Sequence, residues 1–301
     1  MSRQIRCSLI LLTTASIWGL AYVAQKLALG SVGPLTLNTL RGMLAWMFLI
    51  PCRIFLNRYN ERTGKEEKEF DWKTTIRGGI VCGLFLCGGS VCQAYGLRGA
   101  EVGKAGFLTT LYIVMVPVLG MIIGKKCGKK VWFSVALALV GTYLLCVKED
   151  FSINGHDIWL LICALFFAGN IVFISTVCDR VDNVIMSTIQ FFTCSGVTLI
   201  PAIILEHNSL EQIIQAMPVI AYSGIFSCGI GYTIEIIGQE GLDPTVSSLL
   251  LSFESIFSLL AGWLLLHEVL SQQELLGCAI VVFAAIFAQL PEKKLLGKEA
   301  G

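Results

Sequence analysis

Charged residues are scarce in this sequence. Asp, Glu, Lys and Arg make up 14% of its 301 residues, whereas 55% are hydrophobic. Soluble globular domains carry about 25% charged residues, and here the hydrophobic residues recur in blocks of roughly 20, the length that crosses a bilayer as a helix. The composition therefore excludes an ordinary soluble protein and predicts a polytopic membrane protein.

The sequence also lacks the patterns that carry metal and enzyme chemistry. None of the 12 cysteines forms a Cys-x-x-Cys pair, and His156, His207 and His267 fall in separate connections. No P-loop occurs, so ATP is not expected to drive this chain directly. The hydrophobic blocks hold no clustered His or Cys and no paired carboxylates. We therefore expect no cofactor, no metal site, no nucleic-acid partner and no enzyme activity.

Ten blocks are long enough to cross a bilayer as helices, at a rise of about 1.5 Å per residue. They cover approximately residues 8–29, 35–56, 75–97, 105–124, 131–147, 157–178, 184–205, 216–238, 244–266 and 272–290. The sequence thus predicts an all-α integral membrane protein with ten transmembrane helices.

Lys and Arg predict the orientation of these helices. If the N-terminus is inside, only five of the 22 basic residues lie outside or near the outer face: Lys26, Arg41, Arg98, Lys104 and Lys148. Cytoplasmic connections carry the excess of Lys and Arg in membrane proteins. We therefore expect a multi-pass protein of the cell membrane with both termini in the cytoplasm.

The chain also repeats itself. Residues 96–126 align without gaps onto residues 238–268, a shift of 142, and a shift of 149 near the start of each half pairs Trp18 with Phe167 and Arg41 with Gln190. Each half, 1–150 (helices 1–5) and 151–301 (helices 6–10), holds an odd number of helices, so the halves must have opposite orientations. Inverted repeats around a midplane site are a common design of secondary transporters.

Glu254 is the one charged residue between 244 and 266, and it lies near the middle of that block. A carboxylate there costs about 2.5–3.5 kcal/mol on insertion, so it should face protein or a wet cavity and is a functional candidate by default. A hydrogen bond made purely for packing is the alternative. The repeat superposes Tyr112 on Glu254, which places both near the axis that relates the halves.

Several motifs resemble the EamA-type transporters of the drug/metabolite transporter superfamily. They are Trp18-Gly19 followed by Tyr22, Pro34 with Arg41, KAGFLTTLYIVMVPVLG at 104–120, and QEGLDPTVSSLLLSFESIFSLLAGWLLLHEVLSQQELLG at 239–277. The resemblance covers nearly the whole chain. It implies two inverted five-helix repeats, a central cavity lined by both halves, and transport of amino acids or other small metabolites, often outward. That family often has Glu-Pro where this chain has Glu254-Ser255, so the kink that a proline would bring to the ninth helix is not expected here.

The remaining polar groups within the blocks divide into two sets. The candidates for the substrate-binding cavity are Trp18, Tyr22, Tyr112, Asn170 and Glu254, and those for gates or a vestibule are Arg41, Gln93, Gln190 and Glu235. For the aromatic residues, packing is the alternative. Arg41 is expected to pair with a residue such as Glu101 or to face the outer vestibule. Gln93 lies near the outer end of its helix and Glu235 near the inner end of its helix. A role in gating is one explanation for these polar side chains, and solvation at the helix ends is the alternative.

These observations predict a secondary transporter that exports small organic metabolites, such as amino acids, by alternating access around a midplane cavity. The expected partners are a small-molecule solute and membrane lipid, and a coupling proton is left open. A lipid or lipid-headgroup translocator is the first alternative. A membrane enzyme or a scaffold is the second.

Overall fold

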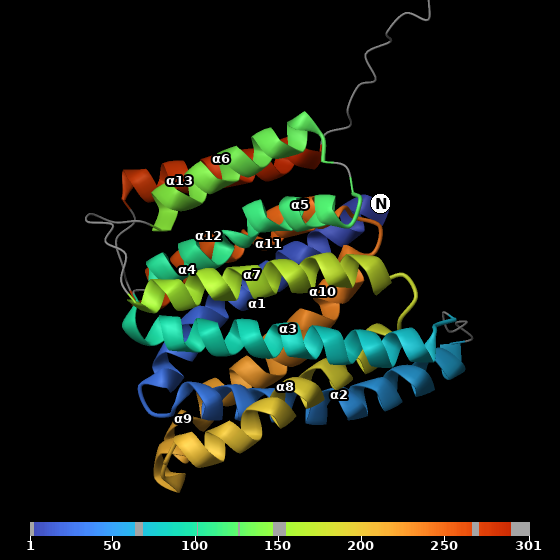
Figure 1. Cartoon of the computed structure of the whole chain (residues 1–301), viewed down its shortest axis with the longest axis vertical. Helices are drawn as coiled ribbons and strands as arrows, with labels where there is room; N and C mark the ends of the chain where they lie inside the picture. The colour runs from blue at the N-terminus through green and yellow to red at the C-terminus, as the bar shows by residue number, and fades with distance from the viewer. Residues whose placement is uncertain are drawn as a thin grey trace, which may run out of the picture.

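The computed structural model describes residues 3–63, 69–100, 102–125, 127–146, 155–266 and 271–289, and the elements within these ranges are all helical (Figure 1). Their bounds are α1 Arg3–Leu29, α2 Pro34–Thr63, α3 Trp72–Gly99, α4 Val102–Thr110, α5 Tyr112–Ile122, α6 Lys129–Cys146, α7 Gly155–Val177, α8 Asn183–Leu205, α9 Leu210–Tyr222, the π-helix η1 Ser223–Gly231, α10 Tyr232–Gln239, α11 Pro244–Leu251, α12 Glu254–Leu266 and α13 Gln272–Gln289.

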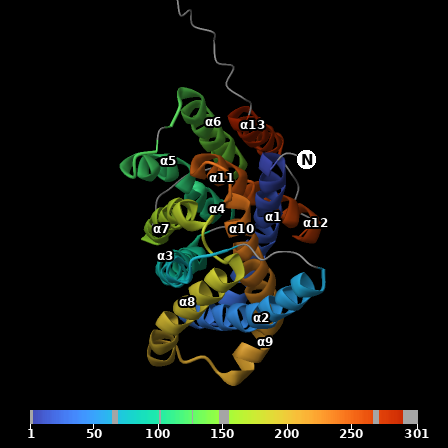
Figure 2. The same ribbon diagram turned by 90° about the vertical axis from the view of Figure 1, so that its right-hand side faces the viewer.

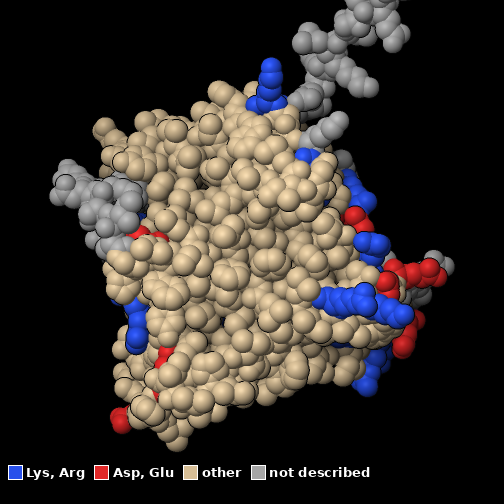
Figure 3. Space-filling model, in the orientation of Figure 1, with Lys and Arg blue, Asp and Glu red and all other residues tan. Residues whose placement is uncertain are grey.

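The helical membrane fold expected from the sequence is confirmed. Of the described helices, nine are long and apolar enough to cross a membrane, with α4–α5 counted as one, α9–η1–α10 as one and α11–α12 as one. The tenth predicted crossing is α6, which has 18 residues. On the face shown in Figure 3, Lys, Arg, Asp and Glu gather at two opposite edges and leave a broad uncharged belt between them, as a bilayer requires.

Local signals in the sequence fix where several helices begin. Asp182 precedes α8 and its side chain accepts a hydrogen bond from the Ile185 backbone N–H at 2.8 Å. Asp243 does the same for the Thr245 N–H at the start of α11, where Pro244 occupies the first turn. Both are N-cap positions at which an acidic side chain satisfies an otherwise unpaired amide. Gly241, with φ of +80°, makes the tight turn between α10 and α11.

The two halves pack as repeats. α2 lies along α8, and α6 lies along α13. In each of these pairs, the two helices are the equivalent elements of the two repeats. Likewise α3 packs on α7, and η1 and α10 pack on α1. Figures 1 and 2 agree that α6 and α13 lie at one end of the molecule and that α2, α8 and α9 lie at the other. Each contact thus has a counterpart in the other half.

Small residues set the closest approaches between the halves. A Cβ added to Gly79 of α3 would lie 2.6 Å from Ile189 Cβ of α8. A Cβ added to Gly83 would lie 2.7 Å from the Gln190 carbonyl oxygen. In the second half, a Cβ on Gly224 of η1 would lie 2.9 Å from the Arg41 carbonyl oxygen of α2. The spacing of four between small residues therefore marks two equivalent helix interfaces, as such patterns do where lipid supplies no hydrophobic drive.

The α2–α8 pair is joined at both ends. At one end, the Glu206 carboxylate accepts hydrogen bonds from the backbone N–H groups of Leu35 and Thr36, at 2.9 and 2.8 Å, and so caps α2 from the other half. At the other end, Arg53 of α2 forms an ion pair of 2.9 Å with Asp182, the N-cap of α8. These contacts make α2 and α8 one unit.

Both helices that cross near the centre are interrupted. α4 and α5 meet at Leu111, and α11 and α12 are separated by Ser252 and Phe253. The shift of 142 places Phe253 on Leu111, so the breaks are equivalent. Thr110 and Ser255 share a side-chain hydrogen bond of 3.1 Å, which joins the two breaks across the halves.

The break in the ninth crossing corrects the expectation from the missing proline. The hydroxyls of Ser248 and Ser252 donate to the carbonyl oxygens of Thr245 and Leu249, each at 2.8 Å. Serine hydroxyls that bond backward in this way compete with the helical ladder and bend helices. The ninth crossing is therefore interrupted before Glu254 without a proline at position 255.

The eighth predicted crossing begins earlier than expected, at Leu210, and contains a nine-residue π-helix that the sequence did not predict. π segments are rare and occur mostly at functional sites. Its wide turn leaves the Ser227 carbonyl oxygen as acceptor for the Trp18 indole N–H at 3.3 Å.

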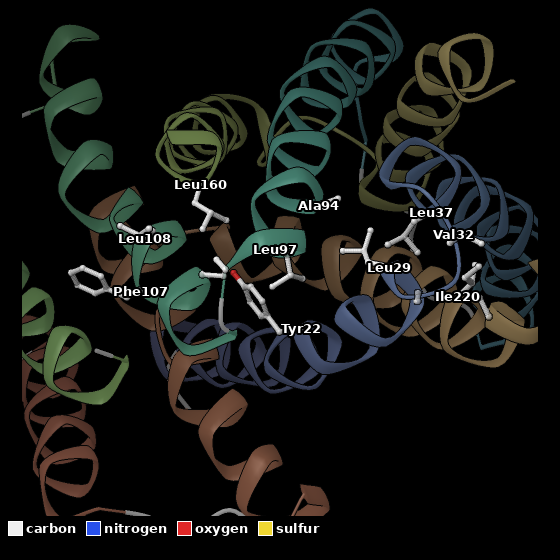
Figure 4. Close-up of a cluster of buried hydrophobic side chains, with 14 of the residues drawn as sticks. Tyr22, Leu29, Val32, Leu37, Ala94, Leu97, Phe107, Leu108, Leu160 and Ile220 are labelled. Carbon is white, nitrogen blue, oxygen red and sulfur yellow. The ribbon is translucent and has the colours of Figure 1, made fainter. Parts of the chain in front are cut away.

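Apolar side chains fill the space beside the central helices. Figure 4 shows one cluster in which Tyr22 and Leu29 of α1, Leu97 of α3, Leu108 of α4 and Leu160 of α7 converge. These residues are at most 6% exposed, so the cluster is closed to solvent, and through Tyr22 it adjoins the polar site described below.

Candidate functional site

A cavity lies where the two halves meet. It is lined by residues of α1, α2, α3, α5, α7, η1, α10 and α12: Trp18, Ala21, Tyr22, Gln25, Arg41, Gln93, Tyr112, Phe167, Asn170, Ile171, Ser227, Tyr232, Glu235 and Glu254. All five candidates for the substrate-binding cavity are among them, together with Arg41, Gln93 and Glu235 from the gating set. Gln190 is not.

The lining follows the internal repeat. Five pairs of lining residues are related by the shifts of 149 and 142: Trp18 with Phe167, Ala21 with Asn170, Tyr22 with Ile171, Gln93 with Glu235, and Tyr112 with Glu254. Side chains related by the pseudo-twofold axis can line one cavity only if that cavity lies on the axis. The chemistry is nevertheless asymmetric, because both carboxylates come from the second half and the guanidinium comes from the first.

Glu254 is the first residue of α12, directly after the helix break. Its side chain is buried, and Oε1 accepts a hydrogen bond from the Tyr112 hydroxyl at 3.3 Å. Because Tyr112 begins α5 at the equivalent break, the two broken helices present their first residues to each other across the cavity.

Glu235 lies in α10, one helical turn from Gln239. Its Oε1 accepts from Gln239 Nε2 at 3.0 Å, while Oε2 is buried and has no hydrogen-bond partner among the described residues. Gln93, its counterpart, donates from Nε2 to the Tyr22 hydroxyl at 3.1 Å. The structure thus places both members of this pair in the lining of one cavity.

Arg41 also lies in the cavity lining. The residue is 6% exposed, and its Nη1 donates to Gln25 Oε1 at 2.6 Å. Glu101, the partner expected from the sequence, is outside the described residues. Gln25 was missed by sequence reasoning, although it lies seven residues after Trp18 and three after Tyr22, on the face of α1 that carries both.

Tyr232 and Ser227 were also missed. The Tyr232 ring packs against Trp18, with centroids 4.5 Å apart, and against Phe191 at 5.4 Å. A nine-residue π-helix directly precedes Tyr232. Because the sequence did not predict this π-helix, it did not predict the direction of the Tyr232 side chain either. Trp18 and Tyr232 form an aromatic wall beside the polar groups.

Gln190 is fully buried away from this lining. Neither atom of its amide group has a hydrogen-bond partner within the described ranges. Its backbone packs against Gly83 in the α3–α8 interface. Although the repeat pairs it with Arg41, it is not among the residues that line the cavity.

The site therefore combines two carboxylates, one guanidinium, three side-chain amides and an aromatic wall in a buried space. Among the described residues, no group of three or more His, Cys, Asp or Glu side chains has a metal-binding arrangement. Convergent polar groups within an otherwise apolar cavity are typical of small-molecule binding.

Known proteins are similar to this chain over nearly its whole length. An uncharacterized transporter of Archaeoglobus fulgidus is 27% identical over 96% of this chain and 87% of its own. The uncharacterized transporter YoaV of Bacillus subtilis is 22% identical over 94% and 96%. A WAT1-related protein of Arabidopsis thaliana, described as chloroplastic, is 25% identical over 94% and 69%.

The fold and the family agree with these relatives. A solved crystal structure superposes with a TM-score of 0.75 at 18% identity, and the superposition covers 94% of this chain and 96% of the other. The model of the EamA-like transporter family matches residues 5–147 and again residues 155–289. The chain therefore belongs to the EamA-like transporter family, as a multi-pass membrane transporter and not an enzyme.

Proposed function

We propose that this chain is a secondary transporter that exports small organic metabolites, amino acids among them, by alternating access between its two halves. One observation carries the proposal: a cavity lined by both halves holds buried charged residues of both signs, Arg41 from the first half and Glu235 and Glu254 from the second. Buried ionisable groups in a membrane protein are costly and mark substrate pathways.

The mechanism follows from the breaks in the two central crossings. Broken helices at the interface of inverted repeats position their ends around a midplane site in secondary transporters. Here Tyr112 and Glu254 begin α5 and α12 directly after equivalent breaks. A symmetric rearrangement of these helices against the α2–α8 unit exchanges the open side of the cavity, while Tyr112 and Glu254 stay next to the cargo.

The proposed orientation has both termini in the cytoplasm of a cell that carries this protein in its cell membrane. The excess of Lys and Arg on the connections assigned to that side supports it. A single cysteine introduced at Glu61, an exposed position near the end of α2, tests it in a cysteine-free background. The cysteine should react with an impermeant maleimide only after the cells are opened, and labelling in intact cells would reverse the orientation.

Flux through proteoliposomes that contain only this protein tests the function. Vesicles loaded with labelled amino acids and other small metabolites should release at least one of them faster than protein-free vesicles do. The release should also be faster than from vesicles that contain the double variant Glu254→Ala/Arg41→Ala. If no solute moves but fluorescent phospholipids change leaflet, the protein is a lipid translocator and the proposal fails.

A further inference from the structure

The carboxyl group of Glu235 is buried with one oxygen unsupported. The residue lines the cavity but is only 1% exposed. Its Oε1 accepts a hydrogen bond from Gln239 Nε2 at 3.0 Å, whereas Oε2 is buried and has no hydrogen-bond partner in the described part of the chain. No ion pair formed by the described residues includes Glu235. A buried charge without partners is so costly that such a group is neutral instead.

Glu254, the other carboxyl of the lining, is better supported. Its Oε1 accepts a hydrogen bond from the Tyr112 hydroxyl at 3.3 Å, and neither of its oxygens is buried without a partner. The lining contains one guanidinium, that of Arg41. A single proton on the two carboxyls therefore brings the formal charge of the lining to zero, and the hydrogen bonds favour Glu235 as its position.

The other ionisable groups around Glu235 do not supply a second cation. The lining adds three phenols, those of Tyr22, Tyr112 and Tyr232, and phenols are neutral at physiological pH. The elements packed around α10 add the thiols of Cys7, Cys82, Cys163, Cys194 and Cys228, the exposed Arg6 and His156, and three groups engaged elsewhere: Arg3 with Asp179, Lys26 with the Leu97 and Ala100 carbonyl oxygens, and Asp157 with Lys104. Among the described residues, Arg41 is the one cation that shares the cavity with Glu235.

Gln239 suits both protonation states of Glu235. An amide group is a donor through its nitrogen and an acceptor through its oxygen. Here Nε2 donates to Glu235, while the Gln239 Oε1 atom is buried and has no partner among the described residues. A half-turn of the amide presents that oxygen to the O–H group of a protonated carboxyl. The same side chain therefore supports Glu235 before and after it takes up a proton.

The cavity is small in this conformation. Its volume is about 40 Å³, and one water molecule needs about 10–15 Å³ measured in this way. About three waters fit, whereas an amino acid does not. The conformation is therefore one in which the site is empty of organic cargo and Glu235 is out of contact with bulk water.

We propose that Glu235 carries a coupling proton and that this cargo-free conformation is its proton-loaded form. The inference rests on the proposed function and deepens it to an exchange of cargo for a proton. After cargo leaves, water on that side protonates Glu235, and the neutral, empty site closes. When the site opens on the other side, water there takes the proton back and cargo binds. Without the proton, closure would bury an unsupported charge, so the empty carrier does not return.

Glu235→Gln is the informative variant, because Gln keeps the size and the hydrogen bonding of the side chain but does not titrate. The internal repeat places Gln93 at the equivalent position of the first half, where it donates to Tyr22, so an amide is compatible with this kind of site. Glu211→Gln, at an exposed position in the first turn of α9, is the matched control.

Infrared spectroscopy of the purified full-length protein at neutral pH tests the protonation state without any cargo. The wild type and Glu211→Gln should show the C=O stretch of a protonated carboxyl group, and Glu235→Gln should lose that band. Absence of the band in the wild type overturns the inference. So does a band that persists in full in Glu235→Gln and is lost in Glu254→Gln.

Proteoliposomes that enclose the pH dye pyranine, together with a solute found to move in the flux assay, test the coupling. As solute leaves, wild-type protein and Glu211→Gln should acidify the lumen, and a more acidic exterior should drive release against a solute gradient. Glu235→Gln should lose both effects while it still carries solute down its gradient at equal pH.

The wild-type measurement does not depend on any variant folding. Solute release without acidification of the lumen overturns the inference and leaves the transport function standing. Release that responds to a sodium gradient but not to a pH gradient does the same. Absence of flux for every solute, in contrast, contradicts the proposed function itself, and the infrared band then still decides whether Glu235 holds a proton.

Discussion

Gly19 lies at a close contact between α1 and the helix that carries Glu254. A Cβ added there would lie 2.6 Å from Phe257 Cβ, 2.7 Å from the Ser258 backbone nitrogen and 2.8 Å from the Glu254 carbonyl oxygen. None of these atoms is the end of a flexible side chain. Since non-bonded carbon atoms prefer separations of about 3.5–4.0 Å, Gly19→Ala should push α1 and α12 apart by roughly 1 Å.

The expected loss of stability is the difference between two effects. Overpacking of this kind costs about 1–3 kcal/mol, whereas replacing a helical glycine with alanine gains about 0.5–1 kcal/mol. Gly19→Ala should therefore lower the free energy of unfolding by about 1 kcal/mol, the difference between the middle values of these two ranges. It should also weaken cargo binding, because the displaced segment carries Glu254.

Thermal unfolding of the purified protein and proteoliposome flux measure the two effects. Gly196→Ala in α8 is the matched control, because an added Cβ there meets nothing within 4 Å, and it should unfold at the wild-type temperature or above. A Gly19→Ala protein that is as stable and active as the Gly196→Ala protein would refute the reasoning from the α1–α12 contact.

Three other substitutions test the remaining contacts. Tyr112→Phe removes the hydroxyl that donates to Glu254 and should lower the free energy of unfolding by about 1–3 kcal/mol. In the double variant with Glu254→Gln, the total loss should be smaller than the sum of the two single losses. Strict additivity of the unfolding free energies would mean that the pair does not interact. Glu206→Ala removes the cap of α2 and should lower the free energy of unfolding by about 1–2 kcal/mol. Glu206→Gln should lower it by less. Equal stability of Glu206→Ala and wild type would show that water replaces the cap. Ser255→Pro restores the Glu-Pro pair but breaks the hydrogen bond to Thr110 and removes the backbone N–H that donates to the Ser252 carbonyl oxygen at 3.2 Å. The loss of two hydrogen bonds should cost about 1–3 kcal/mol, and an unfolding temperature equal to that of wild type would contradict this expectation.

The sequence alone determined the class of protein and the location of its centre. Hydropathy is a property of each segment by itself, so blocks of about 20 apolar residues were sufficient to predict helices that cross a bilayer. The shift of 142 then superposed Tyr112 on Glu254, and the structure brings these two side chains within 3.3 Å. A repeat determines an axis, and a residue near the middle of two equivalent helices must approach it.

The partners of the charged residues depended on the tertiary structure. Arg41 bonds to Gln25, Glu235 shares a cavity with Glu254, and Gln190 lies outside that cavity. These outcomes depend on the rotation of each helix about its own axis, which is set by glycine contacts such as that of Gly224 with α2 and by the π-helix before Tyr232.

The break before Glu254 was likewise decided by the folded structure. Ser248 and Ser252 can bond backward only when their rotamers allow it, and Ser255 reaches Thr110 only because two equivalent breaks meet at the axis. A linear pattern records which residues are polar. Which polar atoms face each other is decided when ten helical crossings pack together, because a side chain in a membrane interior takes its partner from whichever helix lies beside it.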